Sequence, residues 1–292
     1  MSKRLQNISV RPELVEGRTV RGSTGSPRTV NRIDARFREL KLRKEKALIA
    51  YLTVGFPTLR MLPELVEACE QAGVDLIEFG VPFSDPLADG PTIQAASERA
   101  LANGVSPAVV LGQVRRLRRG KVRLPLALMT YYNPVFHYGL SRFCRDSRSA
   151  GVDGLIVPDL PPEEAGDLIR AARPAGMDTI FLAAPTSPPE RLRRVARLST
   201  GFIYYVSLTG VTGARRNLPL QVGAQVRAIK RMTSLPVCVG FGISGPAQAR
   251  AAARVADGVI VGSALTEILR RSGRRAPREA YRFLRSLKRA CA

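Results

Sequence analysis

The sequence predicts an α/β fold, a (β/α)8 barrel (TIM barrel), built as a single catalytic domain from residues 32–292. Eight short apolar runs rich in β-branched residues alternate with helix-like segments between residues 47 and 263. Most of these runs are continuously apolar, which is typical of parallel strands covered on both faces. A doubly wound open sheet is the alternative, but the first run ends in VGFPT and lacks the phosphate loop expected there. Eight repeated units therefore favour the barrel.

The individual elements follow from the same patterns. The expected strands are ALIAYLTVG (47–55), LIEFGV (76–81), LPLALMTYY (124–132), GLIVPD (154–159), DTIFLAA (178–184), GFIYYVSLTG (201–210), PVCVGFG (236–242) and DGVIVGS (257–263). Helices are expected over 59–72, 106–119, 161–175, 188–198 and 221–232, several of them opening with Ser or Thr before Pro. At the C-terminus, Ala280, Phe283, Leu284 and Leu287 recur at helical spacing between arginines, which predicts a basic amphipathic helix.

Positive charge is concentrated at the two ends of the chain. The 292 residues carry a net charge of +22, of which residues 1–47 and 268–292 hold +8 each. Residues 1–31 lack an apolar period and are rich in Gly, Ser, Thr, Pro and Arg, so a disordered extension is expected there. A nucleic-acid-binding protein is one alternative suggested by this charge. No interleaving of aromatic and basic residues supports it, so no specific nucleic-acid partner is expected.

Composition argues against several kinds of site. His137, expected in a loop, is the only histidine, and the four cysteines form no CxxC pair, so no metal centre is expected. Scattered cysteines favour a reducing, cytoplasmic location. No apolar run approaches the ~18–20 residues that cross a bilayer. Lys121 and Lys230 are the only lysines between residues 48 and 267, and neither ends an expected strand, which disfavours a Schiff-base aldolase.

Two carboxylates follow the second expected strand. Strand alternation places Leu76, Glu78 and Gly80 on one face, so Glu78 points into the barrel, where burial raises the pKa of a carboxyl group. A structural Glu paired with a buried Arg is the alternative. The loop FSDPLADGPTIQ adds Asp85 and Asp89, although Asp also caps helices and forms turns. Two acids in unlike environments are a common arrangement for acid/base catalysis.

Glycine-rich loops at the late strand ends suggest phosphate binding. VGFGISGPAQA follows the seventh expected strand, and the eighth ends in IVGSAL. In (β/α)8 barrels, the loops after these strands often bind phosphate through backbone N–H groups and a helix N-terminus. The loop SLTGVTGARRN after the sixth strand is a candidate lid. Ordinary turns are the alternative for any single loop.

The motif LIEFGVPFSDPLADGPTIQ closely resembles the signature of the tryptophan synthase α subunit. The resemblance runs from about Arg36 to Leu287 and includes YLTVGFPT, LMTYYNPVF, GLIVPDLPPEE, IYYVSLTGVTGARRNLP, VCVGFGIS and IVGSAL. It implies a (β/α)8 lyase that cleaves indole-3-glycerol phosphate to indole and glyceraldehyde 3-phosphate. It also implies an α2β2 complex in which the β subunit, and not this chain, carries pyridoxal phosphate.

The resemblance also implies roles for individual residues. Glu78 matches the general acid/base and Asp89 the carboxylate that binds the indole N–H. The expected substrate-binding residues are Tyr51, Ile93, Tyr131 and Tyr204, and the expected phosphate-binding residues are Gly213, Gly242, Gly262 and Ser263. Pro82, Asp85 and Pro86 match positions at the partner interface. A different phosphate-barrel enzyme, such as a sugar-phosphate isomerase or aldolase, is the alternative, but this aromatic pocket suits a flat aromatic substrate better than a bare sugar.

Overall fold

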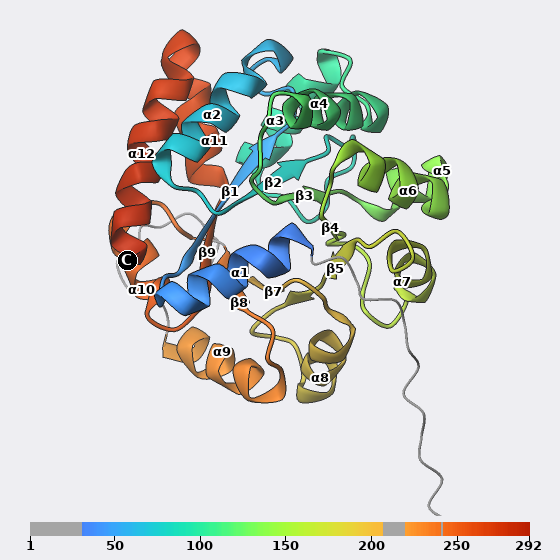
Figure 1. Cartoon of the computed structure of the whole chain (residues 1–292), viewed down its shortest axis with the longest axis vertical. Helices are drawn as coiled ribbons and strands as arrows, with labels where there is room; N and C mark the ends of the chain where they lie inside the picture. Colours follow the sequence, from blue (N-terminus) through green and yellow to red (C-terminus); the bar gives the residue numbers. More distant parts are fainter. Residues whose placement is uncertain (1–30, 207–219, 241) are drawn as a thin grey trace, which may run out of the picture.

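The computed structural model describes residues 31–206, 220–240 and 242–292. One parallel sheet forms the centre of the molecule (Figure 1). Its strands are β1 (Ala47–Thr53), β2 (Leu76–Gly80), β3 (Leu126–Met129), β4 (Gly154–Ile156), β5 (Asp178–Ile180), β6 (Leu182–Ala183), β7 (Ile203–Val206), β8 (Val237–Gly240) and β9 (Gly258–Val261). Each lies within one of the predicted runs, and all the strand pairs are parallel.

The sheet closes into a barrel through its fifth run. The strand order is β5-β4-β3-β2-β1-β9-β8-β7-β6, and β5 and β6 are two halves of one run, separated by Phe181. β5 pairs with β4 and β6 pairs with β7, while the Phe181 carbonyl accepts the Tyr204 N–H at 3.1 Å. The described sheet therefore forms an eight-membered ring, and the predicted (β/α)8 barrel is confirmed.

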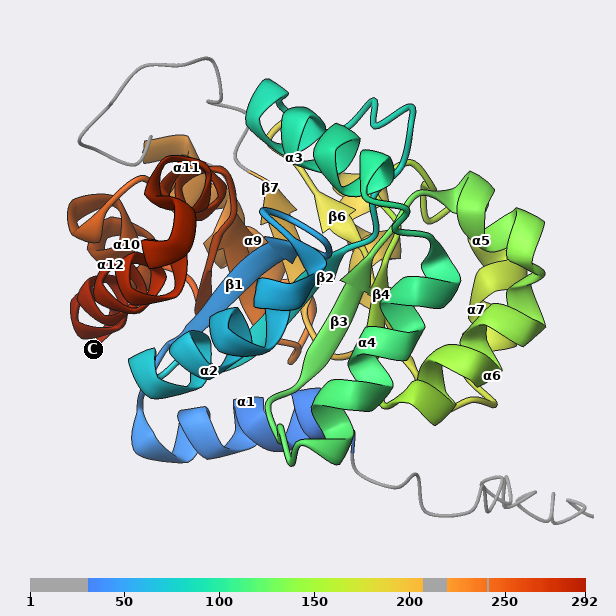
Figure 2. The ribbon, with the colours of Figure 1, turned by 90° about the horizontal axis from the view of Figure 1, so that it is seen from above.

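Helices surround this ring (Figures 1 and 2). They are α1 (Arg32–Arg43), η1 (Leu59–Met61), α2 (Leu62–Ala72), α3 (Pro91–Ala102), α4 (Pro107–Arg119), α5 (Tyr132–Tyr138), α6 (Leu140–Ala150), α7 (Gly166–Ala172), α8 (Pro189–Leu198), α9 (Leu220–Met232), α10 (Pro246–Ala253), α11 (Ser263–Ser272), η2 (Gly273–Arg275) and α12 (Ala276–Cys291). The predicted C-terminal helix is confirmed as α12, which buries Ala280, Leu284 and Leu287 against α2, α10 and α11.

Two local predictions were wrong. The helix expected over 161–175 is shorter, because residues 162–165 form turns and α7 begins only at Gly166. A proline disfavours helical dihedrals in the residue before it, so Pro162 disfavours a helical conformation at Pro161. His137 was expected in a loop, but it lies in α5, where its side chain is exposed. Of the extension expected over residues 1–31, only Asn31 is described; it is buried and caps α1.

The barrel interior and the helix layer form separate apolar clusters. Ile49 and Leu76 belong to the inner cluster, whereas their neighbours Leu48 and Ile77 belong to the layer between strands and helices. α1 lies across one end of the barrel (Figure 1) and buries Phe37 in the inner cluster. This end holds the amino ends of the strands, so the catalytic face is at the opposite end.

The repeated sequence AGVD forms the same junction twice. Gly73 and Gly151 end α2 and α6 with φ of 85° and 102°, a region that favours glycine. Two residues later, Asp75 accepts a backbone N–H of β1 at 2.7 Å, and Asp153 accepts one of β3 at 3.0 Å. Each aspartate therefore ties the start of its own strand to the start of a neighbouring strand.

Basic residues from both ends of the chain pair with these aspartates. Arg36 and Lys288 each lie 2.7 Å from Asp75, and Arg32 lies 2.8 Å from Asp153. Both carboxylates are buried, and a buried carboxylate needs a charge partner and hydrogen bonds. Part of the positive charge at the two ends of the chain therefore pairs with buried carboxylates of the barrel.

Candidate active site

Glu78 lies in β2 with its side chain inside the barrel. It is 0% exposed, and its register partner is Tyr51 of β1. Neither carboxylate oxygen of Glu78 has a hydrogen-bond partner within the described part of the chain. Burial, and secondarily the nearby Asp89, raises the pKa of Glu78 to about 8. Glu78 is therefore protonated at neutral pH, the state required of a proton donor.

Asp89 is held in the loop that follows β2. The Asp89 backbone N–H donates to the Pro86 carbonyl at 3.0 Å, and Gln94 Nε2 donates to the Asp89 backbone carbonyl at 2.9 Å. Burial raises the pKa of Asp89 to about 6, and a hydrogen bond with the Tyr131 hydroxyl opposes that rise. Asp89 is thus mostly ionised at neutral pH. The two carboxyl groups reach different protonation states at the same pH because their surroundings differ.

Tyr131 supports the Asp89 loop from the end of β3. Its hydroxyl oxygen accepts the Ala88 N–H at 3.0 Å and interacts with the Asp89 side chain. Its ring lies 5.3 Å from that of Phe83, measured between centroids. Tyr131 does not appear among the described residues that line the cavity. The structure therefore places Tyr131 against the loop that carries Asp89, outside the described lining of the cavity.

Two glycines make room for the two tyrosines that face the cavity. A Cβ on Gly80 would lie 2.0 Å from the Tyr51 hydroxyl oxygen, and a Cβ on Gly240 would lie 2.7 Å from that of Tyr204. No side chain fits at either position while the rings keep these places. The pKa of the Tyr204 hydroxyl is raised well above its ordinary value, first by burial and then by Glu78, so it remains a donor.

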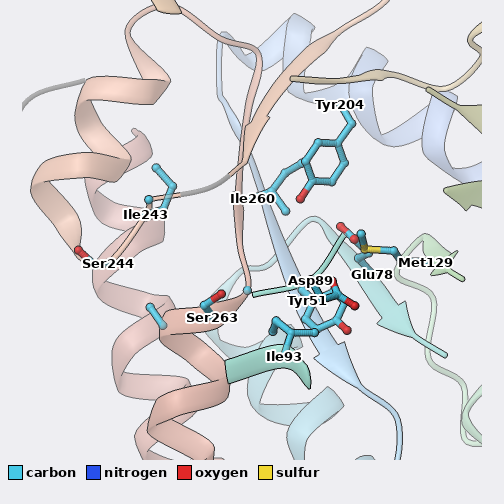
Figure 3. Close-up of a pocket in the computed structure, with 13 residues that line it drawn as sticks. Tyr51, Glu78, Asp89, Ile93, Met129, Tyr204, Ile243, Ser244, Ile260 and Ser263 are labelled. Carbon is cyan, nitrogen blue, oxygen red and sulfur yellow. The ribbon is translucent and has the colours of Figure 1, made fainter. Parts of the chain in front are cut away.

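Tyr51, Glu78, Asp89 and Tyr204 all line a cavity of about 310 Å³ at the carboxyl ends of the strands (Figure 3). Its volume is at the lower end of the range for ligand sites. Figure 3 shows the hydroxyl of Tyr204 directed toward the cavity centre, with Ser244 and Ser263 on the side away from Glu78 and Asp89. The lining residues in the described chain are Tyr51, Glu78, Asp89, Ile93, Met129, Tyr204, Gly242, Ile243, Ser244, Ile260, Gly262, Ser263 and Ala264.

The far side of the cavity has the features of an anion site. α11 begins at Ser263, directly after Gly262, and no side chain caps its N-terminus. The first N–H groups of a helix have no acceptor within it, and the helix dipole favours an anion there. Gly242, with φ of 75°, completes this side. Gly213 and the rest of the expected lid lie outside the described residues.

Sequence reasoning missed several lining residues. Met129 and Ile260 resemble ordinary core positions, and only the barrel geometry shows that they face the cavity. Ser244 could have been found, because it lies between two of the singled-out glycines in VGFGISG. Among the described residues, no Lys, Arg or His lines the cavity, and no cluster of potential metal ligands is present.

The predicted interface residues lie in the loop between β2 and α3, which also carries the cavity-lining Asp89. Pro82 is buried, Asp85 is exposed and Pro86 is half-buried. The sequence reasoning missed two exposed apolar side chains, Leu87 in this loop at 83% exposed and Phe136 in α5 at 64%. Leu87 follows β2 and Phe136 follows β3, and these two strands are paired.

None of the described helices combines the length and the apolar composition of a membrane span.

The comparisons with known proteins point to one family. The family model described as tryptophan synthase alpha chain matches residues 37–291. The tryptophan synthase alpha chain of Geotalea daltonii is 54% identical over 81% of this chain and 89% of its own length. That of Geobacter sulfurreducens is 47% identical over 89% of this chain and 99% of its own.

Solved structures agree with this. The tryptophan synthase subunit alpha of Legionella pneumophila superposes with a TM-score of 0.84 at 37% identity, over 90% of this chain and 98% of that one. A ligand-free tryptophan synthase structure from M. tuberculosis gives a TM-score of 0.80 at 36% identity, over 89% and 99% of the two chains.

Proposed function

The chain belongs to the tryptophan synthase alpha chain family, and we propose how its residues carry out the family's reaction, the cleavage of indole-3-glycerol phosphate to indole and glyceraldehyde 3-phosphate. The observation that carries the proposal is the pair Glu78 and Asp89, two carboxyl groups with different protonation states at one cavity. The reaction needs one proton donor and one anion, and the pair supplies both.

The substrate's orientation follows from the two sides of the cavity. The phosphate group binds at Gly242, Gly262 and Ser263, where the N-terminus of α11 supplies backbone N–H groups. Ser244 adds a hydroxyl on the same side. The indole ring then lies toward the carboxylates, against apolar and aromatic side chains that include Ile93 and Tyr51. Binding at both ends fixes the scissile bond near Glu78.

The chemistry is a retro-aldol cleavage driven by protonation. Neutral Glu78 delivers its proton to indole C3, which makes the ring an electron acceptor. Ionised Asp89 accepts a hydrogen bond from the indole N–H and stabilises the positive charge that develops there. The substrate hydroxyl on the glycerol carbon attached to C3 then loses its proton to the Glu78 carboxylate. The C–C bond breaks, and this carbon becomes the aldehyde of glyceraldehyde 3-phosphate. The electrons of the broken C–C bond return to the ring and restore neutral indole.

In this reaction the carboxyl groups of Glu78 and Asp89 carry out both proton transfer and charge stabilisation. We propose that the chain itself uses no cofactor and no metal ion, because proton transfer and charge stabilisation account for each step. Pyridoxal phosphate is expected only in the β-subunit partner. All four cysteines are free and buried, which supports a reducing, cytoplasmic location.

We propose that the rim beside the cavity docks the β subunit. Leu87 and Phe136 are large apolar side chains left exposed, and they accompany the exposed Asp85. Exposed apolar residues next to an active-site mouth are typical of an interaction surface. Docking there gives an α2β2 complex in which indole leaves toward the partner.

The proposed reaction is tested by measuring indole formation from indole-3-glycerol phosphate, with and without a β subunit. A panel of sugar phosphates lacking the indole ring serves as the comparison. We expect turnover of indole-3-glycerol phosphate and of none of the bare sugar phosphates. Adding the β subunit should make that turnover faster. Turnover of a bare sugar phosphate, together with no indole formation from indole-3-glycerol phosphate, contradicts the proposed reaction. Docking is tested separately by Leu87→Asp, which should abolish the activation by the β subunit and leave the isolated chain's activity unchanged.

A further inference from the structure

Tyr51 brings a third polar group to the carboxylates. The residue is inward-facing on β1 and only 7% exposed, and its hydroxyl reaches the position that a Cβ on Gly80 would occupy. Gly80 ends β2 two residues after Glu78. The hydroxyl therefore lies at the carboxyl end of β2, between Glu78 in the strand and the loop that carries Asp89.

The Tyr51 hydroxyl has one fixed partner. Thr53 Oγ1 donates a hydrogen bond to the Tyr51 hydroxyl oxygen at 3.3 Å. Thr53 is 2% exposed and follows Tyr51 by two residues on the same strand, so both side chains share one face. With its oxygen accepting from Thr53, the Tyr51 hydroxyl keeps its own proton to donate.

Asp89 is the acceptor that the surroundings favour. Tyr51, Glu78 and Asp89 line the same cavity, and both carboxylates raise the pKa of Tyr51, Asp89 more than Glu78. Glu78 is neutral at neutral pH, so the anion beside the hydroxyl is Asp89. The titratable groups that face Asp89 from the surrounding elements are Glu78, Tyr51, Tyr131 and Tyr204.

We propose that Tyr51 is a positioning residue whose hydroxyl donates a hydrogen bond to ionised Asp89, opposite the one from Tyr131. Asp89 is then held between two tyrosine hydroxyls, with its free lone pairs directed toward the substrate. Within the described lining of the cavity no basic side chain is available to do this. The assignment rests on the proposed function, in which ionised Asp89 binds the indole N–H.

The variant Tyr51→Phe removes only the donor and keeps the ring. A hydrogen bond to the charged form of an acid favours that form, so its loss raises the pKa of Asp89. One charge-assisted hydrogen bond corresponds to a shift of about one pH unit. In the pH profile of kcat/KM, the acidic limb should move up by that amount. Turnover should fall about tenfold below pH 6, and the loss should become smaller as the pH rises to 7.5, where Asp89 is mostly ionised in both proteins.

Three companion variants serve as controls. Tyr205→Phe removes a tyrosine hydroxyl from the outer face of the same barrel, where it donates to Gln225, and should not shift the titration of Asp89. Thr53→Val removes the hydrogen bond that orients Tyr51 and should shift it in the same direction as Tyr51→Phe. Thr53→Ser keeps that hydrogen bond, so Asp89 should titrate in this variant as it does in the wild-type protein.

The deciding measurement is a carbon-detected NMR titration of the Asp89 carboxyl group in the full-length free protein. This readout needs no turnover, so it separates failure of this proposal from failure of the proposed function. An Asp89 titration that moves up in Tyr51→Phe and not in Tyr205→Phe supports the proposal. An unchanged Asp89 titration, or a shift at Glu78 alone, overturns it.

Discussion

Gly80 and Tyr51 compete for one space: a Cβ on Gly80 would lie 2.0 Å from the Tyr51 hydroxyl oxygen. We expect Gly80→Ala to displace the Tyr51 ring into the cavity and to lower kcat/KM for indole-3-glycerol phosphate by roughly 100-fold, as a shift of about 1 Å can do. Steady-state assays of the purified variant give this value.

Gly112→Ala is the matched control, because nothing lies within 4 Å of its ideal Cβ and the residue is inside α4. It should leave kcat/KM unchanged and raise stability by about 0.5–1 kcal/mol, the helix preference of Ala over Gly. Equal activity for Gly80→Ala and Gly112→Ala would show that the fit between Gly80 and Tyr51 does not matter.

The rate should depend on pH with two limbs. Turnover requires Asp89 ionised and Glu78 protonated, and their pKa values are raised to about 6 and about 8. We therefore expect kcat/KM to be highest between these values and to fall on either side. Whatever activity Glu78→Gln and Asp89→Asn retain, each variant lacks one of the two titrating groups. Neither should therefore show this two-sided dependence of kcat/KM on pH. A wild-type rate that keeps rising above pH 9 would contradict the assignment of Glu78 as the acid.

Stability should depend on pH for the same reason. Glu78 has a folded-state pKa of about 8, above its ordinary value near 4.5. The folded state therefore retains a proton that the unfolded state loses, so wild-type stability should fall as pH rises from about 4.5 to 8. Glu78→Gln lacks this group, so its advantage over wild type should grow to a few kcal/mol across that window. Urea unfolding at pH 5 and pH 8 measures the difference, and parallel curves for the two proteins would argue against a buried, neutral Glu78.

The junction aspartates should matter for stability and not for chemistry. Asp153 is fully buried, accepts a backbone N–H of β3 and pairs with Arg118 at 2.8 Å. Asp153→Ala leaves Arg118 without this partner and should cost about 3–5 kcal/mol in the free energy of unfolding. Asp167→Ala, which removes an exposed pair with Arg170 on α7, should have almost no effect. A similar loss from both variants would refute the special role of the junction.

Periodicity and residue type predicted the parts of the site that lie within one segment. Glu78 was identifiable because a charged residue interrupts an apolar strand, and strand alternation gave its direction. The loop with Asp85 and Asp89 and the glycine loops were identifiable because parallel strands bring their carboxyl ends together, whereas the choice of Asp89 came from the family resemblance. The same alternation assigned Leu76 and Ile77 to opposite faces, as the structure has them.

Other features depend on contacts between distant segments. The role of Tyr131 behind Asp89 requires the β3 end to meet the loop after β2, which no local pattern shows. The fit of Tyr51 over Gly80 likewise depends on the register of β1 against β2. α1 was missed because its arginines and lysines obscure an apolar stripe of Ile33, Phe37 and Leu40 that closes the barrel.

Every later step of the proposed reaction depends on proton delivery from Glu78 to indole C3, and Glu78→Gln removes that proton donor. The side chain keeps its size and loses its acidity, so the fold should be preserved. Indole formation from indole-3-glycerol phosphate is measured at pH 7 for both proteins, together with binding of a phosphate-bearing indole analogue. We expect Glu78→Gln to lose roughly 1000-fold or more in kcat while it retains binding of the analogue. Indole formation by Glu78→Gln within tenfold of wild type would contradict it.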